Sequence, residues 1–245
     1  MNRGTTPAGA QSEEQAARWV RGMFDRVAPR YDLLNHLLSF QLDRWWRART
    51  IRELRPMLER EGVRVVDLCC GSGDLLAGLQ SRAGGVVFGA DFSHNMLLAA
   101  RKKIAQRGLA SQVFEGDALS LPVADLSLDL VTAAFGFRNL SNYRKGLAEM
   151  WRVLKPGGVA AILEFSTPRG AAFGAVYSFF SRRVLPAIGG AISGSREAYS
   201  YLPESIRKFP DAEQLAEQMR EAGFADVTFH RMTGGAVALH TGKKN

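Results

Sequence analysis

The chain has 245 residues, of which 46% are hydrophobic and 23% charged, and its formal net charge is +8. This length suits one α/β domain with a sizeable core, and the composition excludes a disordered or fibrous protein. The positive charge favours contact with phosphates, nucleic acid or an anionic membrane, but it selects none of them.

The expected compartment follows from the lack of a secretory signal and of a membrane-spanning run in the sequence. The first seventeen residues contain no apolar run that would serve as a secretory signal, and no later run is long enough to span a membrane. The cysteines, Cys69 and Cys70, are neighbours, a spacing that suits neither a disulfide framework nor a metal site. We therefore expect a cytoplasmic protein without a bound metal.

The first 61 residues predict a helical cap that precedes the core. Residues 1 to about 11 are small and polar, and we expect them to be frayed. Ser12 followed by Gln15 is typical of a capping box that opens a first helix. A second, arginine-rich helix is predicted from about residue 35 to 61, in which Trp45 and Trp46 are expected to pack the cap onto the domain.

From Val63 onward, short apolar runs alternate with helical stretches. The runs VRVVDL, VVFGAD, QVFEGD, LDLVTAA and VAAILEF predict parallel strands joined by helical crossovers. Two later runs, DVTFHR and GAVALHT, flank Gly234 and Gly235 and predict a hairpin. This order predicts an α/β, Rossmann-like, mostly parallel seven-stranded sheet with a C-terminal antiparallel hairpin and an N-terminal helical cap.

We interpret residues 1–245 as a single domain with four parts. They are an N-terminal helical cap (1–61), a cofactor-binding core (62–166), a lid or substrate insert (167–209), and a final helix and hairpin (210–245).

The segment VVDLCCGSGDLL carries the first binding signal. Asp67 stands near the end of an apolar strand, and Gly71 and Gly73 stand in the turn before a helix, where glycine lets the backbone approach a ligand. Alone, this turn fits an unliganded strand-to-helix connection equally well. Asp91, about twenty residues further at the end of the second strand, suits ribose hydroxyls, and Asp117 after the third suits an adenine amino group. The alternative is that Asp67 and Asp91 are ordinary loop acids.

Longer segments point to a specific family. YDLLNHLLSFQLDRWW, at Tyr31 to Trp46, and RVLKPGGVAAILEFS, at Arg152 to Ser166, are the most specific, and FGFRN, YLPESIRKFP and GGAVALHTGKK accompany them. The chain resembles the ubiquinone/menaquinone biosynthesis C-methyltransferases over nearly everything from Phe24 to Lys243. Asp43 and Ala134 stand where this family often carries histidine and serine, so we assign neither a role.

The resemblance implies S-adenosylmethionine as the cofactor, with Ser72 in the turn, Asp91 at the ribose, and Asp117 with Ala118 at the adenine. It also implies that the chain is a single methyltransferase domain with the fold of class I S-adenosylmethionine-dependent methyltransferases, and that the acceptor is a lipid quinol. The expected reaction is C-methylation of a polyprenylated hydroquinone in menaquinone or ubiquinone biosynthesis, with demethylmenaquinol converted to menaquinol. Ring type and prenyl-chain length stay open, because the family serves both rings with the same motifs.

Methylation of a ring carbon needs a phenolate, which pushes electron density onto the ortho carbon, and therefore a proton acceptor and stabilisation of negative charge. Arg138 and Asn139 follow the fourth strand, at the edge where such sheets bind ligands. We expect Arg138 to stabilise the phenolate and Asn139 to orient the ring oxygen. In the alternative interpretation, Arg138 pairs with a surface carboxylate.

The N-terminal cap supplies further candidates. Tyr31, Asp32 and Asn35 are expected to close over the cofactor and exclude water, with Tyr31 in a positional role. Asp32 and His36 are the candidate bases, although His36 equally suits a partly exposed helix histidine. Glu164 and Ser166 follow the fifth strand at the same edge of the sheet, where Glu164 has the alternative of bonding only loop amides.

Residues 167–209 combine six Lys/Arg and two Asp/Glu with seven Phe/Tyr. Their apolar centre, with Arg182 and Arg183, predicts a lipid-facing lid and peripheral contact with the inner face of the cytoplasmic membrane. The alternative is a lid that packs internally. A homo-oligomer is compatible with the sequence.

Three other functions were weighed. They are methylation of another small aromatic or lipid acceptor, methylation of nucleic acid, and nucleotide binding without catalysis. FGFRN stands where many base-amino methyltransferases carry an N-P-P-Y tetrapeptide, and no added RNA-binding module is evident, so we expect no nucleic acid partner.

Overall fold

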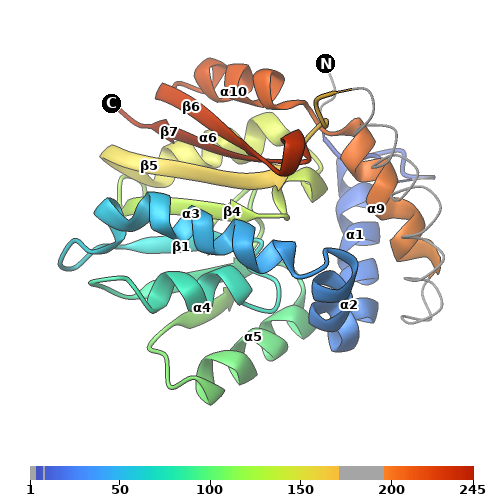
Figure 1. Cartoon of the computed structure of the whole chain (residues 1–245), viewed down its shortest axis with the longest axis horizontal. Helices are drawn as coiled ribbons and strands as arrows, with labels where there is room; N and C mark the ends of the chain where they lie inside the picture. The colour runs from blue at the N-terminus through green and yellow to red at the C-terminus, as the bar shows by residue number, and fades with distance from the viewer. Residues whose placement is uncertain (1–3, 8, 171–195) are drawn as a thin grey trace.

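The computed structural model of the chain describes residues 4–7, 9–170 and 196–245. Within these ranges seven strands form one sheet in the order β3-β2-β1-β4-β5-β7-β6 (Figure 1). The first five are parallel, and β7 is antiparallel to both β5 and β6, which confirms the predicted fold class. The strands are β1 (Val65–Leu68), β2 (Val87–Asp91), β3 (Gln112–Glu115), β4 (Leu128–Ala134), β5 (Leu154–Phe165), β6 (Ala225–Met232) and β7 (Val237–Lys243).

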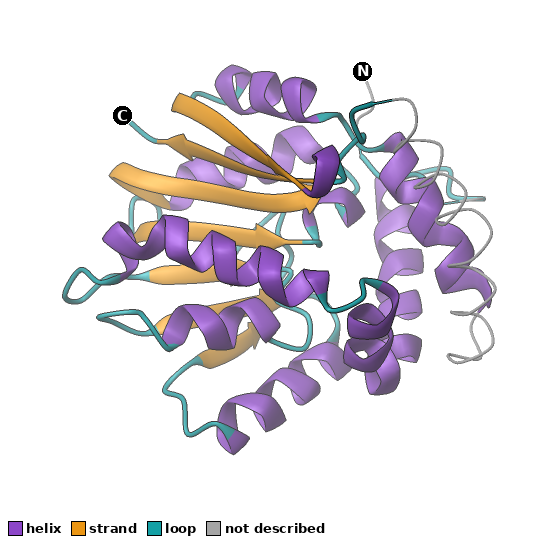
Figure 2. Ribbon diagram, viewed as in Figure 1, coloured by secondary structure: helices purple, strands orange, loops and turns teal. Residues whose placement is uncertain are grey.

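Helices cover both faces of the sheet (Figure 2). Side chains alternate along each strand, so Val66 packs with one helical layer and Val65 with the other. One layer contains α3 (Leu42–Leu58), α4 (Asp74–Gln80) and α5 (His94–Gln106), and the other α6 (Tyr143–Val153) and α10 (Ala212–Glu221). The near-continuous burial of β1, β4 and much of β5 follows from this double cover.

Three further helices gather at the end of the sheet toward which the parallel strands point (Figure 1). They are α1 (Glu13–Val27), α2 (Tyr31–Leu38) and α9 (Arg196–Lys208). Val20 and Met23 of α1 pack with Met96 of α5 and Tyr201 of α9 in a small apolar cluster. None of the helices in the described ranges has the length and apolar character needed to cross a bilayer.

The predicted helix from about residue 35 to 61 is wrong, because the structure divides it. α2 ends at Leu38 and α3 begins at Leu42, and both Phe40 and Gln41 adopt left-handed backbone with φ of 52° and 64°. A left-handed residue cannot continue a right-handed helix, so the chain changes direction there. Apolar residues recur with the helical period of 3.6 residues on both sides of the turn, so the sequence pattern gives no sign of the break.

The N-terminus also differs from the prediction. Residues 4–7 are packed, since the Thr5 backbone N–H donates to the Leu140 carbonyl oxygen at 2.8 Å and its hydroxyl lies 2.7 Å from the Tyr201 hydroxyl. The capping box is only half formed. Ser12 accepts from the Gln15 backbone N–H, but the Gln15 side chain accepts from Gln11 instead of Ser12.

Two smaller expectations need correction. β5 begins at Leu154, ahead of the predicted run, because Leu154 pairs with Leu128 before a register shift. Trp46 is buried and its indole N–H donates to the Thr233 hydroxyl at 2.9 Å, as expected of a packing residue. Trp45 is 51% exposed, so its predicted packing role is wrong.

Candidate functional site

A cavity that is partly open to solvent lies at the carboxyl ends of the parallel strands. This is the edge at which parallel α/β sheets bind ligands. Strands β1, β2 and β4 and the loops after them form its floor, and α1 and α2 contribute Ala17, Phe24 and Tyr31. The other lining residues are Cys69, Gly71, Ala90, Asp91, Phe92, Met96, Gly116, Asp117, Ala118, Leu119, Phe135, Gly136, Asn139, Leu140 and Ser141.

Unusual backbone shapes this floor. Cys69 after β1 and Phe135 after β4 are non-glycine residues with φ of 50° and 58°, a strained conformation of the kind that collects at functional sites. A Cβ on Gly136 would lie 2.3 Å from the Cβ of Cys69, so only glycine fits between the two strand ends. Gly71, with φ of 54°, brings bare backbone to the cavity.

Asp91 is held at the end of β2 by backbone donors. Its carboxylate oxygens accept from the N–H of Gly71 at 2.8 Å and of Ser93 at 2.9 Å. Burial raises the pKa of the Asp91 carboxyl to about 6, although these N–H donors oppose the shift. Each carboxylate oxygen keeps a lone pair for a further donor, so Asp91 can accept from the hydroxyls of a ligand in the cavity.

Asp67 takes a different position. It is buried inside the sheet, outside the cavity lining, and accepts from the Thr132 hydroxyl of β4 at 2.6 Å. Burial raises its pKa to about 7, with the Thr132 bond opposing the rise. This geometry ties β1 to β4 beneath the turn and leaves ligand contact to Gly71 and Asp91.

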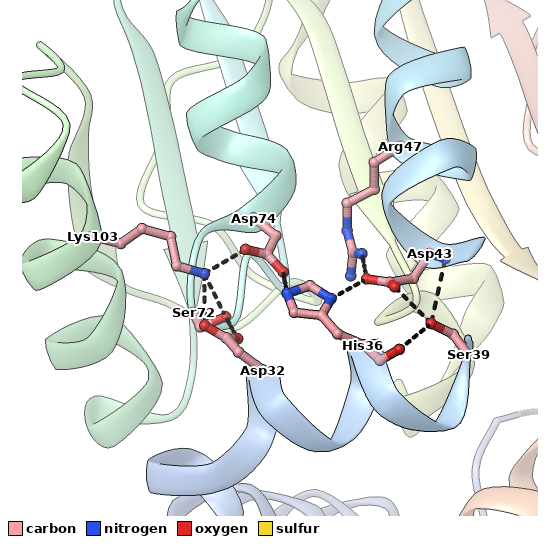
Figure 3. Close-up of polar contacts among 8 residues, drawn as sticks. All are labelled: Asp32, His36, Ser39, Asp43, Arg47, Ser72, Asp74 and Lys103. Atoms are coloured by element: carbon pink, nitrogen blue, oxygen red, sulfur yellow. Dashed lines mark hydrogen bonds and ion pairs between the residues drawn. The ribbon is translucent and has the colours of Figure 1, made fainter. Parts of the chain in front are cut away.

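A network of charges attaches α2 to the cofactor turn (Figure 3). Ser72 donates to Asp32, and the Lys103 ammonium of α5 lies 2.8 Å from Asp32 and also pairs with Asp74. Ser72 and Asp32 therefore bond each other and stand outside the cavity lining. Gly73, with φ of 86°, begins α4 and packs against Ala100, also outside the lining.

The network continues through His36. Its Nδ1 lies 2.8 Å from Asp43 and its Nε2 lies 3.6 Å from Asp74. Ligand atoms of these three residues lie within 4.8 Å of one another, but Arg47 already pairs with Asp43 and Lys103 with Asp74. Two cationic side chains thus balance the carboxylates, and the cluster serves to join α2, α3 and α4. His36 does not reach the cavity lining.

Arg138 is buried behind the cavity, in the short η2 turn (Phe137–Asn139). Its Nη1 lies 3.0 Å from Glu164 Oε1, and its backbone N–H donates to the other carboxylate oxygen. Burial would lower the pKa of the guanidinium, but Glu164 together with Tyr31 and Tyr201 outweighs this effect and holds the pKa above the ordinary value. The carboxylate that Arg138 meets is itself buried, not on the surface. Within the described residues its Nε has no hydrogen-bond partner.

Asn139 lines the cavity, and its side-chain oxygen accepts from the Tyr201 hydroxyl at 3.1 Å. Because Thr5 also contacts that hydroxyl, two distant parts of the chain hold Asn139 in place. Across the cavity, burial raises the pKa of Tyr31, with the Arg138 charge and a bond to Asn35 opposing. Ser166 is buried, and its hydroxyl finds no partner in the described ranges.

The structure thus brings six of the predicted site residues to one cavity and leaves five outside its lining. Those that line it are Tyr31, Gly71, Asp91, Asp117, Ala118 and Asn139, and those outside are Asp32, Asp67, Ser72, Gly73 and Arg138. Sequence reasoning missed Thr5, whose small polar surroundings carry no signal, and Tyr201, which the YLPESIRKFP segment contained without indicating its partner. It also missed the role of Lys103, since a lysine on a helix ordinarily indicates a solvated face.

Comparison with known proteins was made over the whole chain. The model of the ubiE/COQ5 methyltransferase family matches residues 10–244. A Thermus thermophilus protein named demethylmenaquinone methyltransferase is 49% identical over 91% of this chain and 100% of its own length. An Azotobacter vinelandii protein named ubiquinone/menaquinone biosynthesis C-methyltransferase UbiE is 44% identical over 98% of this chain and 96% of its own length.

Solved structures agree on the architecture. A Thermotoga maritima protein described as a SAM-dependent methyltransferase superposes with a TM-score of 0.63 at 20% identity, over 92% of this chain and 100% of that one. At this level of sequence identity, the structural similarity supports the fold alone.

Proposed function

Because the chain belongs to the ubiE/COQ5 methyltransferase family, we propose that it transfers a methyl group from S-adenosylmethionine to a ring carbon of a polyprenylated hydroquinone. The relatives named for demethylmenaquinone and for both quinones support this acceptor class. The higher identity, 49% against 44%, belongs to the demethylmenaquinone relative, so demethylmenaquinol is the expected acceptor and menaquinol the product.

One structural observation carries the cofactor assignment. Gly71 and Asp91 meet at the cavity, where bare backbone stands beside a carboxylate with free lone pairs. Asp91 would accept from the ribose hydroxyls, and Asp117 with Ala118 would border the adenine. Ser72 and Gly73 would shape the turn from behind the lining, and Asp67 would brace it from the sheet.

The bound cofactor would supply an electrophilic sulfonium methyl group. Because Arg138 stands outside the cavity lining, we assign it stabilisation of the phenolate through a water in the cavity. Glu164 fixes its guanidinium, and its Nε has no hydrogen-bond partner within the described residues. Asn139, held by Tyr201, would orient the ring oxygen, and Tyr31 would pack over the ring from α2.

The proton acceptor requires a revised assignment. Asp32 is engaged by Ser72 and Lys103, and His36 lies between two carboxylates outside the cavity lining. Neither candidate base reaches the expected ring position. We therefore propose that water in the cavity takes the phenol proton and later the ring proton, with Arg138 stabilising the anion.

The place of action follows from the acceptor. A polyprenyl chain keeps the quinol in the bilayer, so we propose that the protein works from the cytoplasm at the inner face of the cytoplasmic membrane. The centre of the insert, with Arg182 and Arg183, lies outside the described residues.

The decisive test is methyl transfer in vitro. Purified protein with methyl-labelled S-adenosylmethionine should label reduced demethylmenaquinone, and Arg138→Met should reduce turnover by about 100-fold or more. Labelling of a demethylated benzoquinol at equal efficiency would widen the acceptor class to both rings. Labelling only of small phenols or of nucleic acid would contradict the proposed acceptor.

A genetic test reads the same reaction in cells. A host that lacks its own enzyme should accumulate demethylmenaquinone, and expression of this chain should restore menaquinone in its quinone profile. Restoration of the benzoquinone branch alone would overturn the choice of ring. Calorimetric binding of S-adenosylmethionine without methyl transfer to any quinol would favour a nucleotide-binding scaffold.

A further inference from the structure

The segment that covers the cavity turns an apolar surface outward. Leu33, Leu37, Leu42 and Trp45, which we term the apolar edge, are between 38% and 62% exposed. They make up four of the nine large hydrophobic side chains that are exposed in the described ranges, within thirteen residues of sequence. Scattered exposed hydrophobics need no explanation, but a concentration of this kind marks an interaction surface.

The geometry of the two helices explains the exposure. Asp32 and His36, one turn apart on α2, point toward α4 and α5 in Figure 3. Leu33 and Leu37 follow each of them by one residue, a rotation of about 100° that carries both out of that contact. On α3, Trp46 is buried against the sheet while Trp45 beside it is exposed. α2 thus buries Leu38 in the apolar cluster below it, yet it turns Leu33 and Leu37 to solvent on the side away from Asp32 and His36.

Charge distinguishes between possible occupants of this edge. Arg44 and Arg52 are exposed, and neither forms an ion pair with the part of the chain that the structure describes. Between residues 33 and 52 the sequence has one acid, Asp43, which is buried and paired with Arg47. Glu53, the next acid along α3, is paired with Arg49, so the net exposed charge of this surface is positive. A second copy of the chain would bring like charges together, whereas anionic head groups would complement them.

We infer that the apolar edge docks on an anionic lipid bilayer, with Leu33, Leu37 and Trp45 at the acyl boundary and Arg44 and Arg52 on head groups. This assigns membrane contact to α2 and α3, separately from the insert that the sequence indicated. The inference rests on the proposed function, since Tyr31 at the start of α2 lines the cavity. Docking there would bring the cavity beside the layer that holds a prenylated acceptor.

Vesicle sedimentation tests the inference directly. The full chain is mixed with vesicles of phosphatidylglycerol and phosphatidylcholine, or of phosphatidylcholine alone, at low and high salt. The parent protein should bind the anionic vesicles at low salt. Leu37→Ser with Trp45→Ser should lower the partition coefficient by about tenfold or more, and Arg44→Glu with Arg52→Glu by roughly thirtyfold.

Matched controls use equally exposed positions elsewhere. Val86→Ser with Leu98→Ser removes the same kind of side chain from another surface, and Arg101→Glu with Lys102→Glu reverses the same charges on α5. Both controls should bind vesicles like the parent. Because every substituted side chain is exposed, all variants should keep the parent's circular dichroism and melting temperature.

Three outcomes would overturn the inference. The parent does not sediment with anionic vesicles, the edge variants sediment as well as the controls, or sedimentation velocity shows a parent dimer that the edge variants dissociate. The last result would identify the edge as an interface between copies of this chain.

Activity separates this inference from the proposed function. The edge variants should keep transfer to a water-soluble, unprenylated demethylnaphthoquinol and lose at least about tenfold with a prenylated acceptor in vesicles. If the parent binds vesicles yet methylates neither acceptor, the proposed function fails while the docking surface stands. If the edge variants lose both activities equally, the docking inference fails and the proposed function stands.

Discussion

Asp91 is buried at the cavity, although its proposed contact with the cofactor requires the charged form of its carboxyl group. Two backbone N–H groups hold its carboxylate at the cavity, yet burial still raises its pKa to about 6. In the proposed site the charged form would accept two ribose hydroxyls, so cofactor affinity should follow the ionisation of this residue.

We expect cofactor affinity to weaken as the pH falls through 6, approaching about tenfold per pH unit below it, because a protonated Asp91 loses acceptor capacity. Isothermal titration calorimetry with S-adenosylhomocysteine between pH 5 and 7.5 measures this. Asp91→Asn should bind weakly at every pH and show no slope of its own. An affinity of the parent that stays constant over this range would exclude Asp91 from the ribose site.

Glu164 acts on the reaction through Arg138. It is almost fully buried and bonds both the guanidinium and the backbone N–H of Arg138. Glu164→Gln would leave a buried cation uncompensated, which should lower the free energy of unfolding by about 3–5 kcal/mol. Turnover should fall at least about tenfold, with little change in the KM for the cofactor.

The control for Glu164 is Glu217→Gln, an exposed partner of Arg220 on α10. This change should alter stability by no more than about 0.5 kcal/mol and leave turnover intact. Glu164→Asp, which keeps the charge, should recover part of the lost turnover. If Glu164→Gln keeps full turnover after its stability loss is allowed for, Arg138 does not depend on Glu164 for its position.

At the scale of elements, α2 is attached to the domain by charge as well as by apolar packing of Leu38 and Tyr31. Lys103 bridges Asp32 of α2 and Asp74 of α4, beside the cofactor turn (Figure 3). Lys103→Met should loosen α2, so that its amides exchange faster with deuterium and cofactor affinity falls several-fold. Lys102→Met, at the exposed neighbouring position, should change neither quantity. Unchanged exchange in the Lys103 variant would assign the attachment of α2 to apolar packing alone.

The elements themselves were largely predictable because burial leaves a simple pattern. Each buried strand appeared as a short apolar run, and the hairpin was indicated by paired glycines between two such runs. The break at Phe40 and Gln41 was not, since neither residue favours left-handed backbone and the sequence therefore carries no signal for it.

The residues of the candidate site also divide into those that the sequence predicts and those that it does not. Gly71, Asp91 and Asp117 were predictable because their spacing follows the strand ends. Ser72 and Asp32 were predicted at the ligand, yet they bond each other, because a sequence offset does not determine where a side chain points. Contacts between distant segments, such as Thr5 with Tyr201, are set by the assembled fold and have no local pattern.

At the scale of the whole molecule, Asp67 links the site to the stability of the sheet. It joins β1 to β4 through Thr132, and burial raises its pKa to about 7, above the ordinary value of 3.8. A carboxyl whose folded-state pKa is raised contributes stability that is complete below about pH 4 and is lost as the pH rises through 7. His240 acts oppositely. Burial lowers its pKa to about 4, so its contribution is lost as the pH falls from 6.5 toward 4.

Comparison of variants isolates the part that Asp67 contributes. Between pH 5 and 7 its ionisation should cost the parent roughly 2–3 kcal/mol of unfolding free energy, a slope that Asp67→Asn should remove. Urea unfolding at several pH values measures the difference between the two proteins. Asp129→Asn is the matched control, because bonds to Lys155 and Arg64 lower the pKa of Asp129 despite its partial burial, and it titrates below this window. If the unfolding free energies of the parent and of Asp67→Asn depend on pH in the same way, Asp67 ionises in the folded sheet as readily as in the unfolded chain. The carboxylate would then have to be stabilised by its contacts at the site.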